Sequence, residues 1–323
     1  MWHRATIQSR KQLSPTVTGL TLKIHESSPS TSSSTTTSTF HFVPGQWVDF
    51  QPVPTSSWKP NDNSNKTIGG YSITSIPQSL PCIELAIQSS RHPVAEWVTC
   101  HAKVNDWVNL RVGGSFTYAT GKTTSDSCAT MQQGRLLFVA GGVGINPLFS
   151  MIQQWSVDLR QQHERNRHSR AVLLYSGRHK EDLLFVKELD EMVRELSDHF
   201  RVVLTTTAPA TTEYTGGIVD PPENDSSVDN ENDSIMSNIL FKKGRIDHDM
   251  IKDAVRWINM GNEVIDDERQ VEEEEDDDMI ADLVYICGPP GIPEDVQHLL
   301  LPSQKGRIRF VRSTEDVHFE KWW

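Results

Sequence analysis

Apolar and polar residues follow two different rhythms along the chain, and the change falls near Met131. Before this point, short apolar runs alternate with polar positions, as in residues 17–24, and turn residues separate the runs. Such alternation is typical of strands with one buried face. We expect further strands at residues 40–43, 47–50, 71–76, 83–88 and 107–112, and one short helix over residues 94–100, just after Pro93. Many short strands separated by turns predict an antiparallel β-barrel over residues 1–131.

A short, wholly apolar run at residues 136–140 opens the second part, as expected of a buried parallel strand. Strand-like and helix-like segments then alternate. The expected strands are residues 136–140, 171–175, 201–205, 283–286 and 307–311, and the expected helices are residues 147–159, 182–196, 246–258 and 293–300. This alternation predicts a doubly wound, parallel α/β sheet, which we assign to a second domain over residues 132–323.

Three polar segments interrupt the pattern, at residues 27–39, 209–238 and 261–278. They hold too few apolar residues to offset the entropy of ordering, so we interpret them as low-complexity insertions. The last of them contains seven consecutive acids at residues 272–278, which contribute much of the formal net charge of -12. This acidic balance disfavours nucleic acid as a partner.

The sequence also lacks the patterns of several other protein classes. No run of eighteen apolar residues occurs, so we expect no transmembrane segment. The four cysteines are widely spaced and form no C-x-x-C pair, which disfavours a disulfide framework, a zinc site and an iron–sulfur cluster. We therefore expect no metal and a reducing compartment.

A glycine-rich loop follows the apolar run at residues 136–140 and reads Gly141-Gly142-Val143-Gly144-Ile145-Asn146-Pro147. Glycines let backbone N–H groups approach a pyrophosphate closely, and the start of the following helix favours negative charge. The alternative is a tight turn between a strand and a helix. The strand–loop–helix context favours a dinucleotide phosphate loop.

Two further segments follow strands of the same predicted sheet, where ligands of such folds bind. Cys287-Gly288-Pro289-Pro290 follows the fourth strand, and a cysteine there is suited to contact a nicotinamide ring or to be a small buried residue. Ser176 and Arg178 follow the second strand, where the adenosine ribose is expected. Arg178 and Lys180 favour NADPH through its 2′-phosphate, although Arg178 is also suited to pack on the adenine.

In the first domain, Gly69-Gly70-Tyr71-Ser72 places an aromatic ring and a hydroxyl at a strand start. Alone, this segment is typical of ordinary strand surface. Together with Phe42-Val43-Pro44-Gly45-Gln46-Trp47-Val48, the glycine loop and the cysteine segment, in this order, it resembles the ferredoxin–NADP reductase family. The resemblance implies a flavin-binding barrel followed by an NAD(P)-binding domain, with FAD and NAD(P)H as cofactors.

The resemblance also implies roles for individual residues. Tyr71 would pack on the flavin with Ser72 near its N5 edge, and Cys287 would lie beside the nicotinamide. Glu320 would be a third catalytic group, and an aromatic ring at the C-terminus, Trp322 or Trp323, would cover the flavin. Further cofactor contacts would come from the helix start at Val94, the glycine turn Gly113-Gly114, and the loop residues Gly141, Gly142, Val143, Gly144, Asn146 and Pro147.

One position departs from the family pattern, because Gly69 stands where the family has an arginine that pairs with the flavin phosphate. Arg91 and His92, just before the short helix, are candidates to replace that contact.

The expected activity is hydride transfer from NAD(P)H to bound FAD and then to an external acceptor that the sequence does not identify. The alternatives are a reductase that uses free flavin as a substrate and a non-catalytic dinucleotide-binding module. We expect a monomer and a cytoplasmic location, with mitochondria as the alternative.

Overall fold

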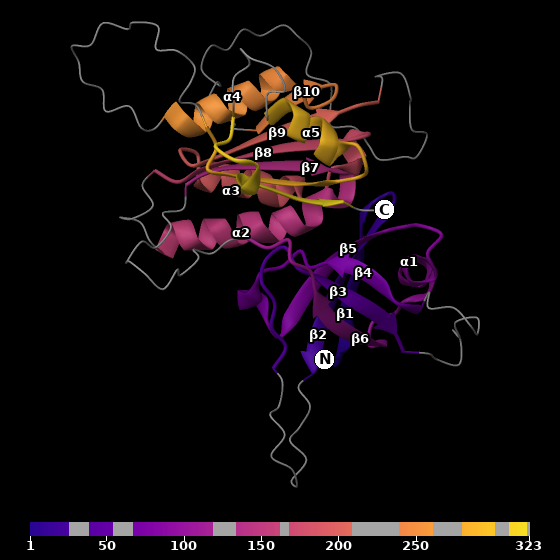
Figure 1. Cartoon of the computed structure of the whole chain (residues 1–323). Coiled ribbons are helices and arrows are strands. Elements are labelled where there is room, and N and C mark those ends of the chain that lie inside the picture. Colours follow the sequence, from indigo (N-terminus) through magenta and orange to yellow (C-terminus); the bar gives the residue numbers. More distant parts are fainter. Residues whose placement is uncertain are drawn as a thin grey trace, which may run out of the picture.

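The computed structural model describes residues 1–25, 39–53, 67–118, 134–161, 168–208, 239–260, 280–300 and 310–321. These residues form two domains, one built on an antiparallel sheet and one on a parallel sheet (Figure 1). The expected domain boundary near Met131 lies outside the described residues, as do the three polar insertions apart from Thr39. Within the described ranges, no helix is long and apolar enough to cross a membrane.

The first domain is an antiparallel barrel. Its strands are β1 (His3–Ser14), β2 (Val17–His25), β3 (Trp47–Pro52), β4 (Gly69–Ser72), β5 (Cys82–Gln88) and β6 (Trp107–Gly113). They pair in the order β4-β3-β6-β1-β2-β5, and a bridge between Ile73 and Leu85 brings the two ends together. Alternate side chains fill the interior, as the sequence predicted; Val48 and Phe50 are fully buried. The short helix α1 (Pro93–Glu96) continues into a wider turn, whose Trp97 ring lies 6.2 Å from that of Phe50.

The second domain is the doubly wound α/β unit that the sequence predicted. Its parallel strands are β7 (Arg135–Gly141), β8 (Arg170–Gly177), β9 (Phe200–Thr206), β10 (Ile239–Lys243), β11 (Leu283–Gly288) and β12 (Val317–Lys321), in the order β10-β9-β8-β7-β11-β12. Helices α2 (Ile145–Gln161) and α3 (Val186–Glu195) cover one face. Helices α4 (His248–Asn259) and α5 (Ile292–Leu300) cover the other.

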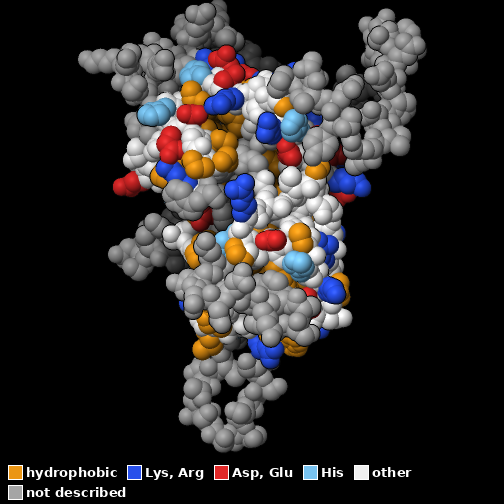
Figure 2. Space-filling model, turned by 90° about the vertical axis from the view of Figure 1, so that its right-hand side faces the viewer, with side chains coloured by type: hydrophobic (Ala, Val, Ile, Leu, Met, Phe, Trp, Pro, Cys, Tyr) orange, Lys and Arg blue, Asp and Glu red, His pale blue; other side chains and the backbone are white. Residues whose placement is uncertain are grey.

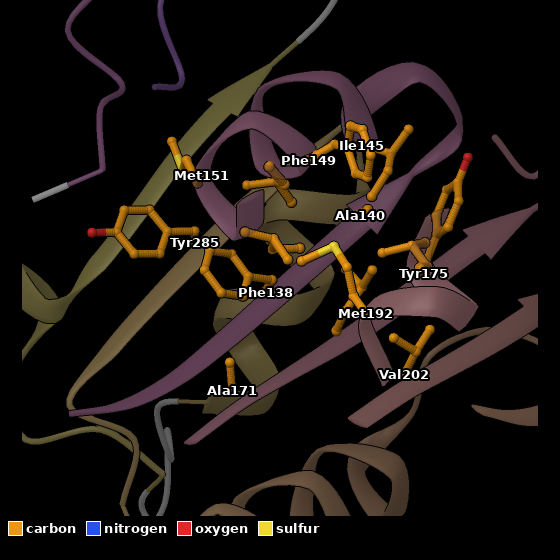
Figure 3. Packing of buried hydrophobic residues seen from close by; sticks show 14 of the residues in the cluster. Phe138, Ala140, Ile145, Phe149, Met151, Ala171, Tyr175, Met192, Val202 and Tyr285 are labelled. Carbon is orange, nitrogen blue, oxygen red and sulfur yellow. The ribbon is translucent and has the colours of Figure 1, made fainter. Parts of the chain in front are cut away.

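Helix α2 lies at the seam between the two domains (Figure 1) and shares its core with both. In Figure 3 its residues Ile145, Phe149 and Met151 lie over the sheet residues Phe138 and Tyr285. The rings of Phe138 and Tyr285 are stacked, with centroids 5.4 Å apart. Most residues of α2 are buried, because the parallel sheet covers one side of the helix and the barrel covers the other.

Polar residues of α2 fasten the domains together. The Asn146 amide donates a hydrogen bond to the carbonyl of Ala86 in β5 (2.8 Å), and the Ser150 hydroxyl donates to the carbonyl of Ser75 (2.6 Å). Gln153 donates to the carbonyl of Thr74 (2.8 Å). These contacts hold the start of α2, and therefore the glycine loop before it, in a defined position against the barrel.

Two expected strands differ from the structure, at residues 40–43 and 307–311. Residues 40–43 form no strand. Their alternation of apolar and polar residues arises because Phe40 and Phe42 pack into the barrel core, and the segment does not pair with another strand. The expected strand at residues 307–311 lies mostly outside the described residues, and Val311 makes only an isolated bridge with Ala281. The edge next to β11 is instead formed by β12, and β10 adds a strand that the sequence did not predict.

Helix α3 also begins at Val186 rather than at residue 182. Phe185, immediately before it, has a left-handed backbone with φ of 60°, which interrupts the helical pattern. Its ring stacks on Phe149 of α2 with centroids 4.1 Å apart, so packing across the two helices stabilises this unusual backbone.

Candidate functional site

A cleft of about 360 Å³ lies where the barrel meets the carboxyl ends of β7 and β8. It is lined from the barrel by the β1–β2 turn and Gln88, and from the α/β domain by Gly142, Val143, Arg178, His179, Glu181 and Asp182. The carboxyl ends of parallel strands are the usual ligand edge of such sheets. The structure therefore brings together Gly142, Val143 and Arg178 from two segments that the sequence analysis singled out separately.

Within the glycine loop, Gly142 is the position that faces open space. Its φ is +52°, and a Cβ built there would meet no atom within 4 Å. Glycine tolerates this left-handed backbone, and the lack of a side chain leaves the backbone N–H groups approachable. Gly142 therefore has the properties that a phosphate contact requires.

Gly144 has a different environment from the one that a phosphate contact implies. A Cβ at Gly144 would overlap the carbonyl of Cys287 and would come 2.7 Å from the Cα of Gly288. Gly141 is likewise buried, and a Cβ there would overlap the Ile292 side chain and lie 3.2 Å from the Cδ of Pro289. These two glycines thus allow the two sequence motifs to pack against each other.

Three further predicted site residues, Asn146, Pro147 and Ser176, are buried beside the glycine loop. Asn146 and Pro147 are buried in α2, and the Asn146 amide already donates to Ala86. The Asn146 Oδ1 atom has no hydrogen-bond partner among the described residues. Ser176 is buried and lies beside Gly141 in the sheet register. We therefore assign these three residues to the support of the loop, and their direct contact with a cofactor stays a prediction.

Cys287 and Glu320 lie side by side at the end of the parallel sheet. Cys287 is buried in β11, between Ala140 of β7 and Glu320 of β12. The Oε2 atom of Glu320 is buried and has no hydrogen-bond partner among the described residues. Burial raises the pKa of the Glu320 carboxyl from 4.5 to about 7. This carboxyl can therefore hold or release a proton near neutral pH. Pro289 and Pro290, after the strand, are exposed.

On the barrel, Ser72 is buried and its hydroxyl also has no partner among the described residues. Each domain thus contributes a predicted catalytic residue with an unpaired buried oxygen. Buried polar atoms are normally paired, so an unpaired one in a ligand site requires an explanation such as a missing ligand contact. Neither Ser72 nor Glu320 lines the cleft described above, and their contact with one flavin stays a prediction.

Tyr71 packs against residues of the barrel. It lies opposite the buried Val48, and its ring contacts Phe50 edge-on with centroids 6.0 Å apart. A Cβ at Gly69 would lie 2.6–2.8 Å from atoms of the same ring. The Tyr71 ring therefore occupies the space beside Gly69, where the family's arginine side chain would begin. Burial raises the pKa of the Tyr71 hydroxyl, and its packing on a flavin stays a prediction.

Gly113 and Gly114 accommodate a residue that the sequence analysis did not select. A Cβ at either position would come within 3.0 Å of the indole of Trp47. Trp47 lies opposite both Ser72 and Gly113 in the sheet register, and its ring is half-buried. The sequence contained the signal, since a large aromatic residue stands in the Gln46-Trp47 motif. Only strand pairing shows that glycines receive its ring.

The start of α1 has fewer free N–H groups for a phosphate contact than the sequence suggested. The Val94 side chain belongs to the barrel core, and its N–H group donates to the Nδ1 atom of His92 (3.3 Å). Pro93 has no N–H group to donate. Arg91 is exposed, with no ion pair among the described residues, so it stays available for a phosphate contact.

Two other predictions reach the limits of the described structure. Trp322 and Trp323 lie outside the described residues. Among the described residues, no cluster of three or more His, Cys, Asp or Glu is arranged to hold a metal ion. A second cavity at the seam, about 380 Å³ in volume, is lined by residues such as Leu13 and Phe149 and contains none of the predicted site residues.

Comparisons with known proteins show which proteins this chain resembles. A family model described as the oxidoreductase NAD-binding domain matches residues 138–236. The chain is 29% identical over 290 residues to the Bos taurus protein named oxidoreductase NAD-binding domain-containing protein 1, covering 88% of this chain and 72% of that protein. The Danio rerio protein of the same name is 28% identical over 293 residues, covering 88% of this chain and 82% of its own length.

Solved structures show the same fold at low sequence identity. Cytochrome P450 reductase GcoB from Amycolatopsis is 16% identical with a TM-score of 0.60, covering 99% of this chain and 69% of that one. Ferredoxin-NADP+ reductase from Plasmodium falciparum is 15% identical with a TM-score of 0.57, covering 99% of this chain and 95% of that one. These findings confirm the resemblance to ferredoxin–NADP reductase-like proteins and the predicted two-domain fold.

Proposed function

We propose that this protein is an NAD(P)H-dependent flavoprotein that passes a hydride from the nicotinamide to FAD and then delivers electrons to an external acceptor. The oxidoreductase NAD-binding domain match covers the glycine loop from its strand onward. The structure of a Neisseria gonorrhoeae ferredoxin NADP+ reductase, which has the same fold at a TM-score of 0.55, has bound FAD and NADP.

The observation that carries the proposal is the pair of unpaired buried oxygens, Ser72 Oγ in the barrel and Glu320 Oε2 in the α/β domain. Both atoms belong to residues that the motifs single out for the reacting end of the site. Leaving a buried polar group unpaired costs about 1–3 kcal/mol. A cofactor that pairs with both would remove this cost and so contribute to its own binding.

The chain's own residues have distinct tasks in this scheme. When bound, FAD supplies the capacity to take up two electrons together and to release them singly. Gly142 leaves room for the nicotinamide dinucleotide phosphates, and Arg178 provides a positive charge in the same cleft. Ser72 donates a hydrogen bond from its hydroxyl, and Glu320 holds a proton on its carboxyl near neutral pH. The packing of Gly144 on Cys287 fixes the distance between the two loops.

The absorption spectrum of the purified protein tests the proposal. We expect a yellow protein that releases about one FAD per chain on denaturation and is bleached anaerobically by NADH or NADPH. A Ser72→Ala variant should keep its FAD and be reduced more slowly, since only the hydroxyl is lost. A colourless protein that also fails to bind added FAD would contradict the proposal.

A second candidate, a reductase that uses free flavin as a diffusing substrate, is favoured by the phosphate end of the flavin site. Gly69 has no side chain there, the Tyr71 ring fills the adjacent space, and His92 already accepts the Val94 N–H. Weak phosphate contacts would let flavin exchange. Saturation of NAD(P)H oxidation by added FMN or riboflavin, with protein purified free of flavin, would distinguish this activity from that of a tightly bound FAD.

A further inference from the structure

A cavity of about 180 Å³ lies between β9, β10 and α4, on the face of the parallel sheet that α4 covers. The glycine loop and α2 lie toward the other face, so this cavity is separate from the cofactor cleft. Three of its lining residues are cationic, Arg201, Lys242 and Arg256, and one is acidic, Asp253. A local excess of positive charge is unexpected in a chain with a net charge of -12.

The charges in the cavity are incompletely paired. Asp253 forms an ion pair with Lys242 at 3.4 Å, and both side chains are partly exposed. Within the described residues, neither the half-buried Arg201 nor the exposed Arg256 donates a side-chain hydrogen bond to a protein acceptor. The Nε atom of Arg201 is itself buried and without a partner. A buried N–H group without an acceptor is costly, because it has lost its contact with water and gained no partner in exchange.

Arg201 is held in place by Trp257. Its guanidinium carbon lies 4.8 Å from the centroid of the indole, and Arg170 lies 5.2 Å from the same ring. Arg170 also donates to the carbonyl of Trp257 at 3.1 Å. The two arginines therefore share one aromatic partner and repel each other. Burial and the nearby Arg170 lower the pKa of Arg201, while Asp253 acts in the opposite direction.

We propose that this cavity is a binding site for a small oxyanion of the phosphate type. Arg201 is preorganised by its contact with Trp257, and a guanidinium presents parallel donors that match phosphate oxygens. Lys242 and Arg256 supply further charge from β10 and α4. An anion bound here would bridge the cationic side chains of Arg201, Lys242 and Arg256 and so join the edge strand to α4.

Thermal unfolding with inorganic phosphate as the probe tests this proposal. At constant ionic strength maintained with sodium chloride, phosphate should raise the Tm of the wild-type protein saturably, by about 3 °C. Arg201→Gln should abolish the rise, and Arg201→Lys should retain part of it because the charge remains. Loss of the rise is a readout separate from any drop in the basal Tm of the variant.

Two control variants distinguish this cavity from other sources of a phosphate effect. Arg245→Gln removes a largely exposed arginine outside the cavity and should leave the rise unchanged. Arg178→Gln alters the cofactor cleft and should also leave it unchanged. The proposal is overturned if phosphate has no effect, if Arg245→Gln removes the effect equally, or if Arg178→Gln rather than Arg201→Gln removes it.

Discussion

The change Glu320→Gln should make the protein more stable at high pH while leaving its stability at low pH nearly unchanged. The Glu320 carboxyl is half-buried at the end of β12, its Oε2 atom has no partner among the described residues, and burial raises its pKa from 4.5 to about 7. Below pH 4.5 the carboxyl is protonated in both the folded and the unfolded chain, and glutamine imitates that state.

The sign of the effect follows from the direction of the shift. As the pH rises above 4.5, the unfolded chain loses this proton while the folded chain keeps it. The free energy of unfolding therefore falls between pH 4.5 and about 7 and stays lower above that range. Glutamine has no such proton, so the variant does not suffer this loss.

The magnitude follows from the size of the shift. At about 1.4 kcal/mol per pKa unit, the full shift sets an upper limit of roughly 3.4 kcal/mol. Because the side chain is only half-buried, solvent screening reduces the expected gain to about 1–2 kcal/mol at pH 8. For a domain of this size the gain corresponds to a rise of about 3–6 °C in Tm.

The assay is chemical or thermal unfolding of the wild-type and variant proteins between pH 4.5 and pH 8. The same substitution at Glu315, an exposed residue of the turn before β12, controls for the loss of a surface charge. If the stability difference between Glu320→Gln and the wild type is the same at pH 5 and pH 8, the carboxyl is not held protonated by burial, and its assignment as a proton holder fails with it.

Three further predictions follow from the same geometry. Gly144→Ala should destabilise the protein by about 2–3 kcal/mol, because its Cβ would overlap the Cys287 backbone. Gly142→Ala should cost about 1 kcal/mol and should act mainly on the KM for the nicotinamide cofactor. Equal losses of stability in the unfolding curves of the two variants would contradict this difference. Asn146→Ala should remove the hydrogen bond to Ala86, lower the free energy of unfolding by about 1–2 kcal/mol and speed proteolytic cleavage between the domains. An unchanged rate of proteolysis would show that this hydrogen bond does not hold the two domains together. Arg178→Gln should raise the KM for NADPH more than that for NADH in steady-state assays, and an equal change for both would show that Arg178 does not contact a 2′-phosphate.

Much of the architecture could be predicted from local patterns in the sequence. The alternating runs of the first part and the wholly apolar runs of the second are direct consequences of how many faces each strand buries, so they distinguished the barrel from the parallel sheet. The glycine loop could be placed because a strand, a glycine turn and an apolar helix follow one another without a gap. Strand β10 escaped prediction because it is a lysine-bearing edge strand with exposed side chains, which gives little alternation.

The amino-acid sequence specifies which residue types are available for a site, whereas packing between distant segments sets what each of them contacts. Gly142 and Gly144 are equivalent in the motif, but one faces open space and the other the backbone of Cys287, because β7 and β11 are neighbours in the sheet. Trp47 lies beside Gly113 only because β3 pairs with β6. The raised pKa of the Glu320 carboxyl likewise depends on burial by residues that are distant in the sequence. The contacts of a side chain and the polarity of its surroundings are set by packing between segments, and a local sequence pattern encodes neither of them.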